Sequence, residues 1–201
     1  MDVLHWIPIV ICAYILGAIP FGYIVGRTQG INIREHGSGN IGFTNTWRVL
    51  GFKLGLVVLF CDGLKGWMSC YIGYLLMGEI GALTGGMVAI LAHTFSCFIG
   101  FKGGKGIATG GGVLLFMSPL TLAICLGVVI VICLTIRYMS LGSILAATLA
   151  PVLLYVTGAP MCYVCGIAVA AMYVIYKHIP NIKRLLNGTE NKLTFGSKKT
   201  G

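Results

Sequence analysis

The chain has 201 residues, of which 57% are hydrophobic and 9% charged, with a mean hydropathy of +0.94 and a formal net charge of +9. About a quarter of the residues in a soluble domain are charged, so this composition excludes a soluble domain and indicates one membrane-embedded domain over residues 1–201. The Lys and Arg residues are scattered between apolar segments instead of forming one basic face, which argues against nucleic acid as a partner.

Seven hydrophobic runs follow one another along the chain: 3–26, 54–77, 80–98, 107–117, 120–136, 141–156 and 161–176. A single helix over residues 107–136 would be about 45 Å long, whereas a hydrocarbon core is about 30 Å thick. Ser118-Pro119 offers a break in this stretch. The sequence therefore predicts an all-α integral membrane protein, a bundle of seven transmembrane helices in which the fourth and fifth are short or broken.

The connections between these runs alternate in charge. Those before residue 3 and at 78–79, 118–119 and 157–160 contain no Lys or Arg, and the other set contains every cation except Lys65. Lys65 lies inside a hydrophobic run near Asp62, which it is expected to neutralise. The positive-inside rule then predicts a multi-pass protein of the cytoplasmic membrane. Its N-terminus is expected outside and its C-terminus, with a flexible tail at 192–201, in the cytoplasm.

The first polar segment of the cytoplasmic set, residues 37–48, alternates Gly with Ser, Asn and Thr. Such a backbone is flexible and its N–H groups can converge on an anion, while Arg48 offers a planar fork suited to phosphate. An ordinary polar turn between two membrane helices is the alternative. The candidate substrate-binding residues of this segment are Ser38, Gly39, Asn40, Thr44, Asn45 and Arg48.

The second segment, residues 92–109, places two Lys around a Gly pair at the start of a predicted helix. Backbone amides, the helix dipole and ammonium groups can then point at one anion. The spacing is not that of a Walker A loop, because Gly106 follows Lys105 where Ser or Thr is required. The candidate binding residues are His93, Lys102, Gly103, Gly104, Lys105, Gly106 and Thr109.

The third segment, residues 177–190, combines His178 with a short amphipathic stretch that Pro180 would begin as a helix along the membrane surface. A lone His at a membrane exit is also commonly an interface residue. The candidates here are His178, Asn181 and Arg184, and residues 137–143 add Ser143.

These cytoplasmic segments together predict a site for a substrate with more than one phosphoryl group. No carboxylate pair is expected in it, because Glu35 and Glu190 stand isolated in the sequence. The HxxxxD arrangement of the common glycerol-phosphate acyltransferases is absent as well. Neither a metal nor a cofactor is expected.

Three motifs resemble, in order and spacing, the signatures of the bacterial acyl-phosphate:glycerol-3-phosphate acyltransferase (PlsY) family. They are Ser38-Gly39-Asn40-x-Gly42-x-Thr44-Asn45, Phe101-Lys102-Gly103-Gly104-Lys105-Gly106-x-Ala108-Thr109, and His178 followed by Asn181-Ile182-x-Arg184-Leu185 and Gly188-Thr189-Glu190. The resemblance implies a seven-helix enzyme that moves an acyl chain from acyl phosphate to the 1-hydroxyl of glycerol 3-phosphate, the first acylation of phospholipid synthesis. It also implies a handover of acyl phosphate from the enzyme that makes it.

The resemblance implies catalytic roles for Ser38, Lys105 and His178. The base that takes the hydroxyl proton is either His178 or the donor's own phosphate. The sequence departs from the usual family pattern at Phe43, Ala92, Ser96 and Pro180. A multipass carrier for a phosphorylated anion and a purely structural bundle remain as alternatives from the residues alone.

Overall fold

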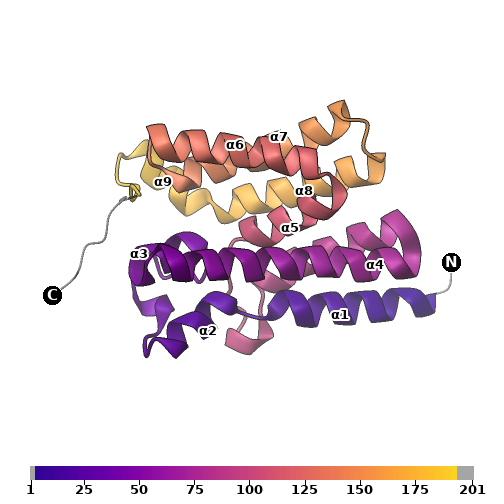
Figure 1. The fold of residues 1–201 in the computed structure, drawn as a ribbon, viewed down its shortest axis with the longest axis horizontal. Helices are drawn as coiled ribbons and strands as arrows, with labels where there is room; N and C mark the ends of the chain where they lie inside the picture. Colours follow the sequence, from indigo (N-terminus) through magenta and orange to yellow (C-terminus); the bar gives the residue numbers. More distant parts are fainter. Residues whose placement is uncertain (1–2, 194–201) are drawn as a thin grey trace.

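The computed structural model describes residues 3–193, and every regular element in that part of the chain is a helix (Figure 1). The predicted all-α class is therefore confirmed. The predicted flexible tail at 192–201 lies outside the described residues from position 194 onward. The 3₁₀ helices are η1 (Val3–His5), η2 (Ile33–Glu35) and η3 (Cys97–Ile99). The α-helices are α1 (Trp6–Ala18), α2 (Phe21–Thr28), α3 (Phe43–Leu50), α4 (Phe52–Thr94), α5 (Ile107–Met117), α6 (Pro119–Thr135), α7 (Met139–Val156), α8 (Met161–Lys177) and α9 (Ile179–Leu186).

The second and third hydrophobic runs form the two arms of α4, which turns back on itself at Met77 and Gly78. Gly78 has φ 60°, a conformation that glycine adopts at little cost. The arms touch through glycines, since a Cβ added to Gly73 would lie 2.0 Å from the carbonyl oxygen of Gly81. Small residues of this kind let two membrane helices approach closely.

The first hydrophobic run is broken, whereas one continuous segment was predicted. Helix α1 ends at Ala18, and α2 begins after Pro20, which has no N–H to continue the hydrogen-bond ladder. The break leaves the carbonyl oxygen of Ile19 open to a side chain, and Lys65 Nζ donates to it at 2.8 Å.

The predicted break after residue 117 is confirmed. Ser118 has an extended conformation, and its hydroxyl accepts a hydrogen bond from the backbone N–H of Thr121, so that it caps α6. Pro119 occupies the first turn, where its missing N–H costs nothing.

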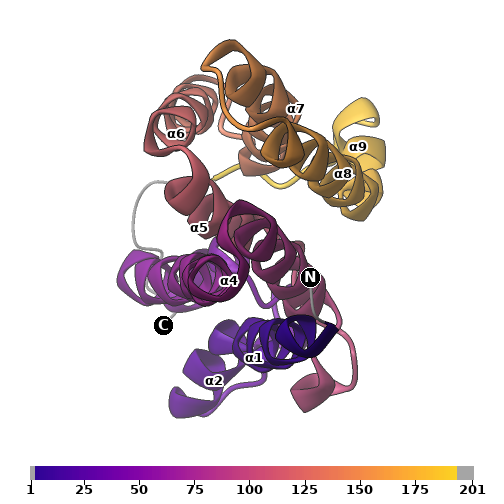
Figure 2. The ribbon, with the colours of Figure 1, turned by 90° about the vertical axis from the view of Figure 1, so that its right-hand side faces the viewer.

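The helices form two groups with α5 between them (Figure 2). One group contains α1, α2 and α4, and the other contains α6, α7 and α8. The main apolar core joins α4, α5, α7 and α8 through residues such as Ile90, Val113, Leu154 and Ile167. Within residues 3–193, three helical segments can cross a membrane by length and composition, or four if the bent pair α8 and α9 is one span.

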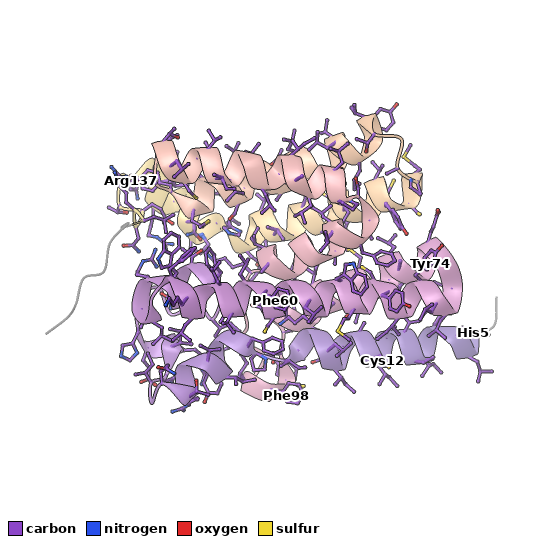
Figure 3. The ribbon with its side chains drawn as sticks, viewed as in Figure 1. His5, Cys12, Phe60, Tyr74, Phe98 and Arg137 are labelled. Carbon is purple, nitrogen blue, oxygen red and sulfur yellow. The ribbon has the colours of Figure 1, made fainter. Side chains whose placement is uncertain are left out.

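The segments that carry most of the polar residues lie at one end of the molecule. Helices α3 and α9 lie at this end, opposite the beginning of α1 (Figure 1). Arg137 lies at the same end, while His5 and Tyr74 lie at the other (Figure 3). The segments predicted to bind substrate therefore come together at one end of the bundle.

Candidate active site

A cavity of about 480 Å³ opens at this end, between α3 and α4 on one side and α6 to α9 on the other. Most of the predicted site residues line it: Ser38, Asn40, Thr44, Asn45, Arg48, His93, Lys105, Gly106, Ser143, His178, Asn181 and Arg184. The structure thus joins segments that lie more than a hundred residues apart in the sequence. Gly39, Lys102, Gly103, Gly104 and Thr109 were also predicted to bind substrate but are not among its lining residues.

The first segment is held in place by the buried side chain of Asn45. Its amide nitrogen lies within hydrogen-bond distance of the carbonyl oxygens of Ile33 (3.3 Å) and His36 (3.0 Å), and its oxygen accepts the backbone N–H of Ser38 at 2.8 Å. The side chain of Asn45 therefore shapes the loop that presents Ser38. Residues 43–50 form helix α3 instead of the flexible loop that was expected, and this helix carries Arg48 to the cavity wall.

The backbone amides of the glycine pair in the second segment bond within the protein, whereas they were predicted to point at an anion. The backbone N–H groups of Gly103 and Gly104 donate to the carbonyl oxygens of Thr94 (2.9 Å) and His93 (3.1 Å). They tie the loop to the last turn of α4 and are not free to bind an anion. The beginning of α5, at Gly106 and Ile107, does line the cavity, so the positive end of that helix dipole faces it.

Thr109 is also placed differently from the prediction. It is fully buried on α5. A Cβ added to Gly66 on α4 would lie 2.2 Å from the carbonyl oxygen of Thr109. This residue therefore packs α5 against α4.

Lys105, Asn181, Glu190 and Arg184 form a connected polar chain across the cavity. Lys105 Nζ donates to Asn181 Oδ1, and Asn181 Nδ2 donates to Glu190 Oε1 at 2.7 Å. Glu190 also accepts from Ser140 Oγ at 2.8 Å and pairs with Arg184 Nε at 2.7 Å. Glu190 was expected to be isolated, and instead it is the hub that fixes the third segment against α7.

The charges in this chain alter one another's protonation. Burial lowers the pKa of Lys105 to about 8, Glu190 opposes the shift, and Arg184, Arg48 and Lys177 add to it. Burial would raise the pKa of Glu190, but hydrogen bonds from Asn181, Ser140 and Arg184 hold it below its ordinary value. The cavity therefore has an excess of positive charge that an anionic ligand would relieve.

His178 lies at the junction of α8 and α9 and is 3% exposed. Its Nδ1 is 2.8 Å from the carbonyl oxygen of Val174. Burial lowers the pKa of His178 to about 4, with the Val174 contact opposing the shift and Lys105 adding to it. At neutral pH the ring is therefore uncharged, with Nδ1–H donating to Val174 and Nε2 left as an acceptor.

Comparison with known proteins identifies the family. The sequence of residues 7–188 matches the family described as glycerol-3-phosphate acyltransferase. A glycerol-3-phosphate acyltransferase of Fusobacterium nucleatum is 46% identical over 190 residues, covering 92% of this chain and 97% of the relative. A glycerol-3-phosphate acyltransferase of Geobacillus kaustophilus is 41% identical, and the match covers 96% of this chain and 98% of the relative. The chain belongs to the glycerol-3-phosphate acyltransferase family.

Solved structures of this acyltransferase family have the same fold. The crystal structure of PlsY, an integral membrane glycerol 3-phosphate acyltransferase, in its glycerol 3-phosphate form superposes with a TM-score of 0.90 at 39% identity. The superposition covers 94% of this chain and 96% of the chain in the crystal structure. The crystal structure of PlsY in its lysophosphatidic acid form superposes with a TM-score of 0.88 at 38% identity. The chain is thus an integral membrane acyltransferase with the PlsY fold.

Part of the lining of this cavity is apolar, and this part is called the apolar groove. Phe43, Trp47, Phe52, Leu56 and Leu59 line one wall, and Leu126, Val129, Ile130, Cys133 and Leu134 of α6 line the other. Several of these side chains are exposed on the outer surface of the bundle, among them Leu56, Ile130 and Leu134.

Ser140 and Glu190 lie in the predicted segments, but neither was named as a site residue. Glu190 follows Gly188, whose φ of 69° turns the chain back toward α7 after α9 ends. The only sequence signal for this contact was the position of Glu190 at the end of the third motif.

Proposed function

We propose that this protein transfers the acyl chain of acyl phosphate to the 1-hydroxyl of glycerol 3-phosphate, giving lysophosphatidate and phosphate. The observation that carries this proposal is the form of the cavity, in which a cationic end and an apolar groove meet. A donor with a phosphate head and a fatty chain matches both parts at once, and glycerol 3-phosphate needs only the cationic part. Family membership gives the carrier alternative no support.

The two phosphates are assigned to different cations. Arg48 and Ser38 would hold the phosphate of the acyl donor, because they lie in the same segment of the chain as Phe43 and Trp47, which line the apolar groove. The beginning of α5 would add the positive end of its helix dipole. Lys105, Arg184 and Ser143 would hold glycerol 3-phosphate. His178 would accept a hydrogen bond from a glycerol hydroxyl through Nε2.

The chemical step needs little from the protein beyond position and charge. The hydroxyl oxygen forms a bond to the acyl carbon, and the bond between that carbon and the phosphate oxygen breaks. The proton of the hydroxyl passes to the departing phosphate, which leaves as hydrogen phosphate. Because phosphate is a good leaving group, alignment and stabilisation of the oxyanion are the main demands.

Orientation and cellular place are part of the proposal. The bundle would cross the cytoplasmic membrane seven times with its N-terminus outside, so that the cationic end faces the cytoplasm, where glycerol 3-phosphate dissolves. Acyl phosphate would arrive from the enzyme that forms it, with its chain entering the groove from the lipid side.

Purified protein in detergent, given acyl phosphate and radiolabelled glycerol 3-phosphate, tests this function. Labelled lysophosphatidate should form with the wild type and fall sharply with Lys105→Met, while Lys53→Met, at an exposed position outside the cavity, serves as the matched control. Uptake of label into sealed vesicles without any acylated product would support a carrier and refute the proposal.

A further inference from the structure

Three ionisable side chains are buried together below the floor of the cavity. Asp62 and Lys65 lie on the first arm of α4 and His93 on the second, and they are 1%, 3% and 3% exposed. Asp62 and His93 also line the cavity. Burying a charged pair in a membrane bundle costs free energy, so such groups commonly mark a functional site.

Three polar atoms surround the Nζ of Lys65, which forms an ion pair with Asp62. Its Nζ lies 2.8 Å from Asp62 Oδ1, 2.8 Å from the carbonyl oxygen of Ile19 and 2.9 Å from His93 Nδ1. Two donors cannot face each other at 2.9 Å. With Lys65 charged in its ion pair with Asp62, His93 Nδ1 is assigned as the acceptor, which places the proton of the neutral ring on Nε2.

The other side of the His93 ring touches the loop that carries Lys105. A Cβ added to Gly104 would lie 2.0 Å from His93 Nε2, so the ring fills the space that this glycine leaves open. The carbonyl oxygen of His93 accepts the N–H of Gly104 as well. The position of His93 therefore fixes the turn that leads directly into Lys105.

We propose that Asp62 and Lys65 are positioning residues that hold His93 as the Nε2–H tautomer, with its ring against Gly104 and its Nε2–H donor at the cavity wall. This inference rests on the proposed function for its link to phosphate binding, but the tautomer itself does not. Within the proposed function, Nε2–H supplies a neutral hydrogen-bond donor next to the loop of Lys105, which is assigned to the phosphate of glycerol 3-phosphate. Ion pairing of Asp62 with Lys65 keeps this cluster electrically neutral.

Nitrogen-15 NMR of histidine-labelled protein in lipid bilayers tests the tautomer directly. The His93→Gln variant identifies which signals belong to His93. The wild type should show a protonated Nε2 and an unprotonated Nδ1. In Lys65→Met the tautomer should invert, because Nδ1–H can then donate to Asp62 Oδ1, which lies 3.6 Å away. We expect kcat/KM of that variant to fall about 10–100-fold, as for other positioning partners of a functional His.

The double variant Asp62→Asn/Lys65→Met separates positioning from structural support. It removes the buried pair together, which costs less stability than removing one charge. The amide N–H of the new Asn can donate to Nδ1, so the Nε2–H tautomer and at least tenfold of the lost activity should return. Lys53→Met, at an exposed site, should behave like the wild type.

A wild-type ring protonated on Nδ1 would overturn the inference, and so would a double variant that regains the tautomer without regaining activity. If the wild type has the expected tautomer but forms no lysophosphatidate, the proposed function fails while the tautomer assignment stands. If Lys65→Met does not fold, the wild-type tautomer and the double variant still decide the matter.

Discussion

His178 Nδ1 lies 2.8 Å from the carbonyl oxygen of Val174, one helical turn earlier on α8. A catalytic His is commonly oriented by a carboxylate, and here a backbone carbonyl orients the ring. The contact leaves Nε2 as an acceptor within a cavity that also contains Lys105 and Arg184. With its pKa at about 4, His178 is a weak base, which favours the donor phosphate as the proton acceptor.

The His178→Asn variant should therefore mainly raise KM for glycerol 3-phosphate. The acidic limb of the pH profile should remain, because it reflects ionisation of substrate phosphate near pH 6. Steady-state kinetics from pH 5 to 8 measures both quantities. A loss of about a thousandfold or more in kcat, with wild-type KM and no acidic limb, would show instead that His178 is the base.

Lys105 should produce the alkaline limb of the profile of kcat/KM. Its pKa of about 8 in the free protein means that the cation proposed to bind phosphate loses its charge as the pH rises through that value. In Lys105→Arg the side chain stays charged at all accessible pH values, so the limb should vanish even though the altered geometry lowers activity. An unchanged limb in that variant would assign it to another group.

If Arg48 holds a phosphate as proposed, Arg48→Lys should cut activity severely, because it keeps the charge but loses the planar fork that can contact phosphate through two N–H groups. Exposed Lys53 provides the control, and Lys53→Ala should have little effect. Both variants are compared by kcat/KM for the acyl donor. Equal, small effects at the two positions would mean that Arg48 serves only to orient the protein in the membrane.

Glu190→Gln should destabilise the protein by about 1–3 kcal/mol, because three donors lose a charged acceptor. Since its pKa is depressed in the folded protein, its contribution is full above the ordinary value of about 4.3 and is lost as the pH falls below it. The difference in thermal stability from the wild type should therefore shrink in acid. The matched control is Glu35→Gln, at an exposed position. If Glu190→Gln is as stable as Glu35→Gln, Glu190 does not stabilise the polar chain.

The proposed orientation predicts which positions an impermeant thiol reagent can reach from outside. In a background without native Cys, Cys at Glu79 or Thr157 should react in intact cells. Cys at Lys53 or Lys183 should react only after the membrane is opened. All four positions are exposed in the structure. Labelling at Lys183 from outside would reverse the orientation.

Much of the fold could be predicted because hydrophobic length and Pro have local effects. The break at Ser118-Pro119 follows from a run too long to cross once, and the turn at Met77 and Gly78 follows from a polar interruption. The break at Pro20 was missed because apolar residues continue on both sides of it. A hydropathy pattern contains no information about the backbone N–H that Pro20 lacks.

The sequence predicted which residues lie at the site better than it predicted what each of them contacts there. Gly103 and Gly104 suggested anion binding, but their amides close the loop onto α4. Asn45 and Asn181 use their side chains to hold other site residues. Such roles depend on which carbonyl or amide the folded chain brings within about 3 Å, and no spacing in the sequence records that.

The donor preference tests the proposed reaction most directly. Purified protein, free of any enzyme that makes acyl phosphate, is supplied in parallel with acyl phosphate and with acyl-CoA, and lysophosphatidate and free phosphate are both measured. We expect equal amounts of the two products from acyl phosphate and none from acyl-CoA, because the cavity offers cations for a phosphate leaving group and the sequence has no HxxxxD motif. Efficient turnover of acyl-CoA would contradict this mechanism.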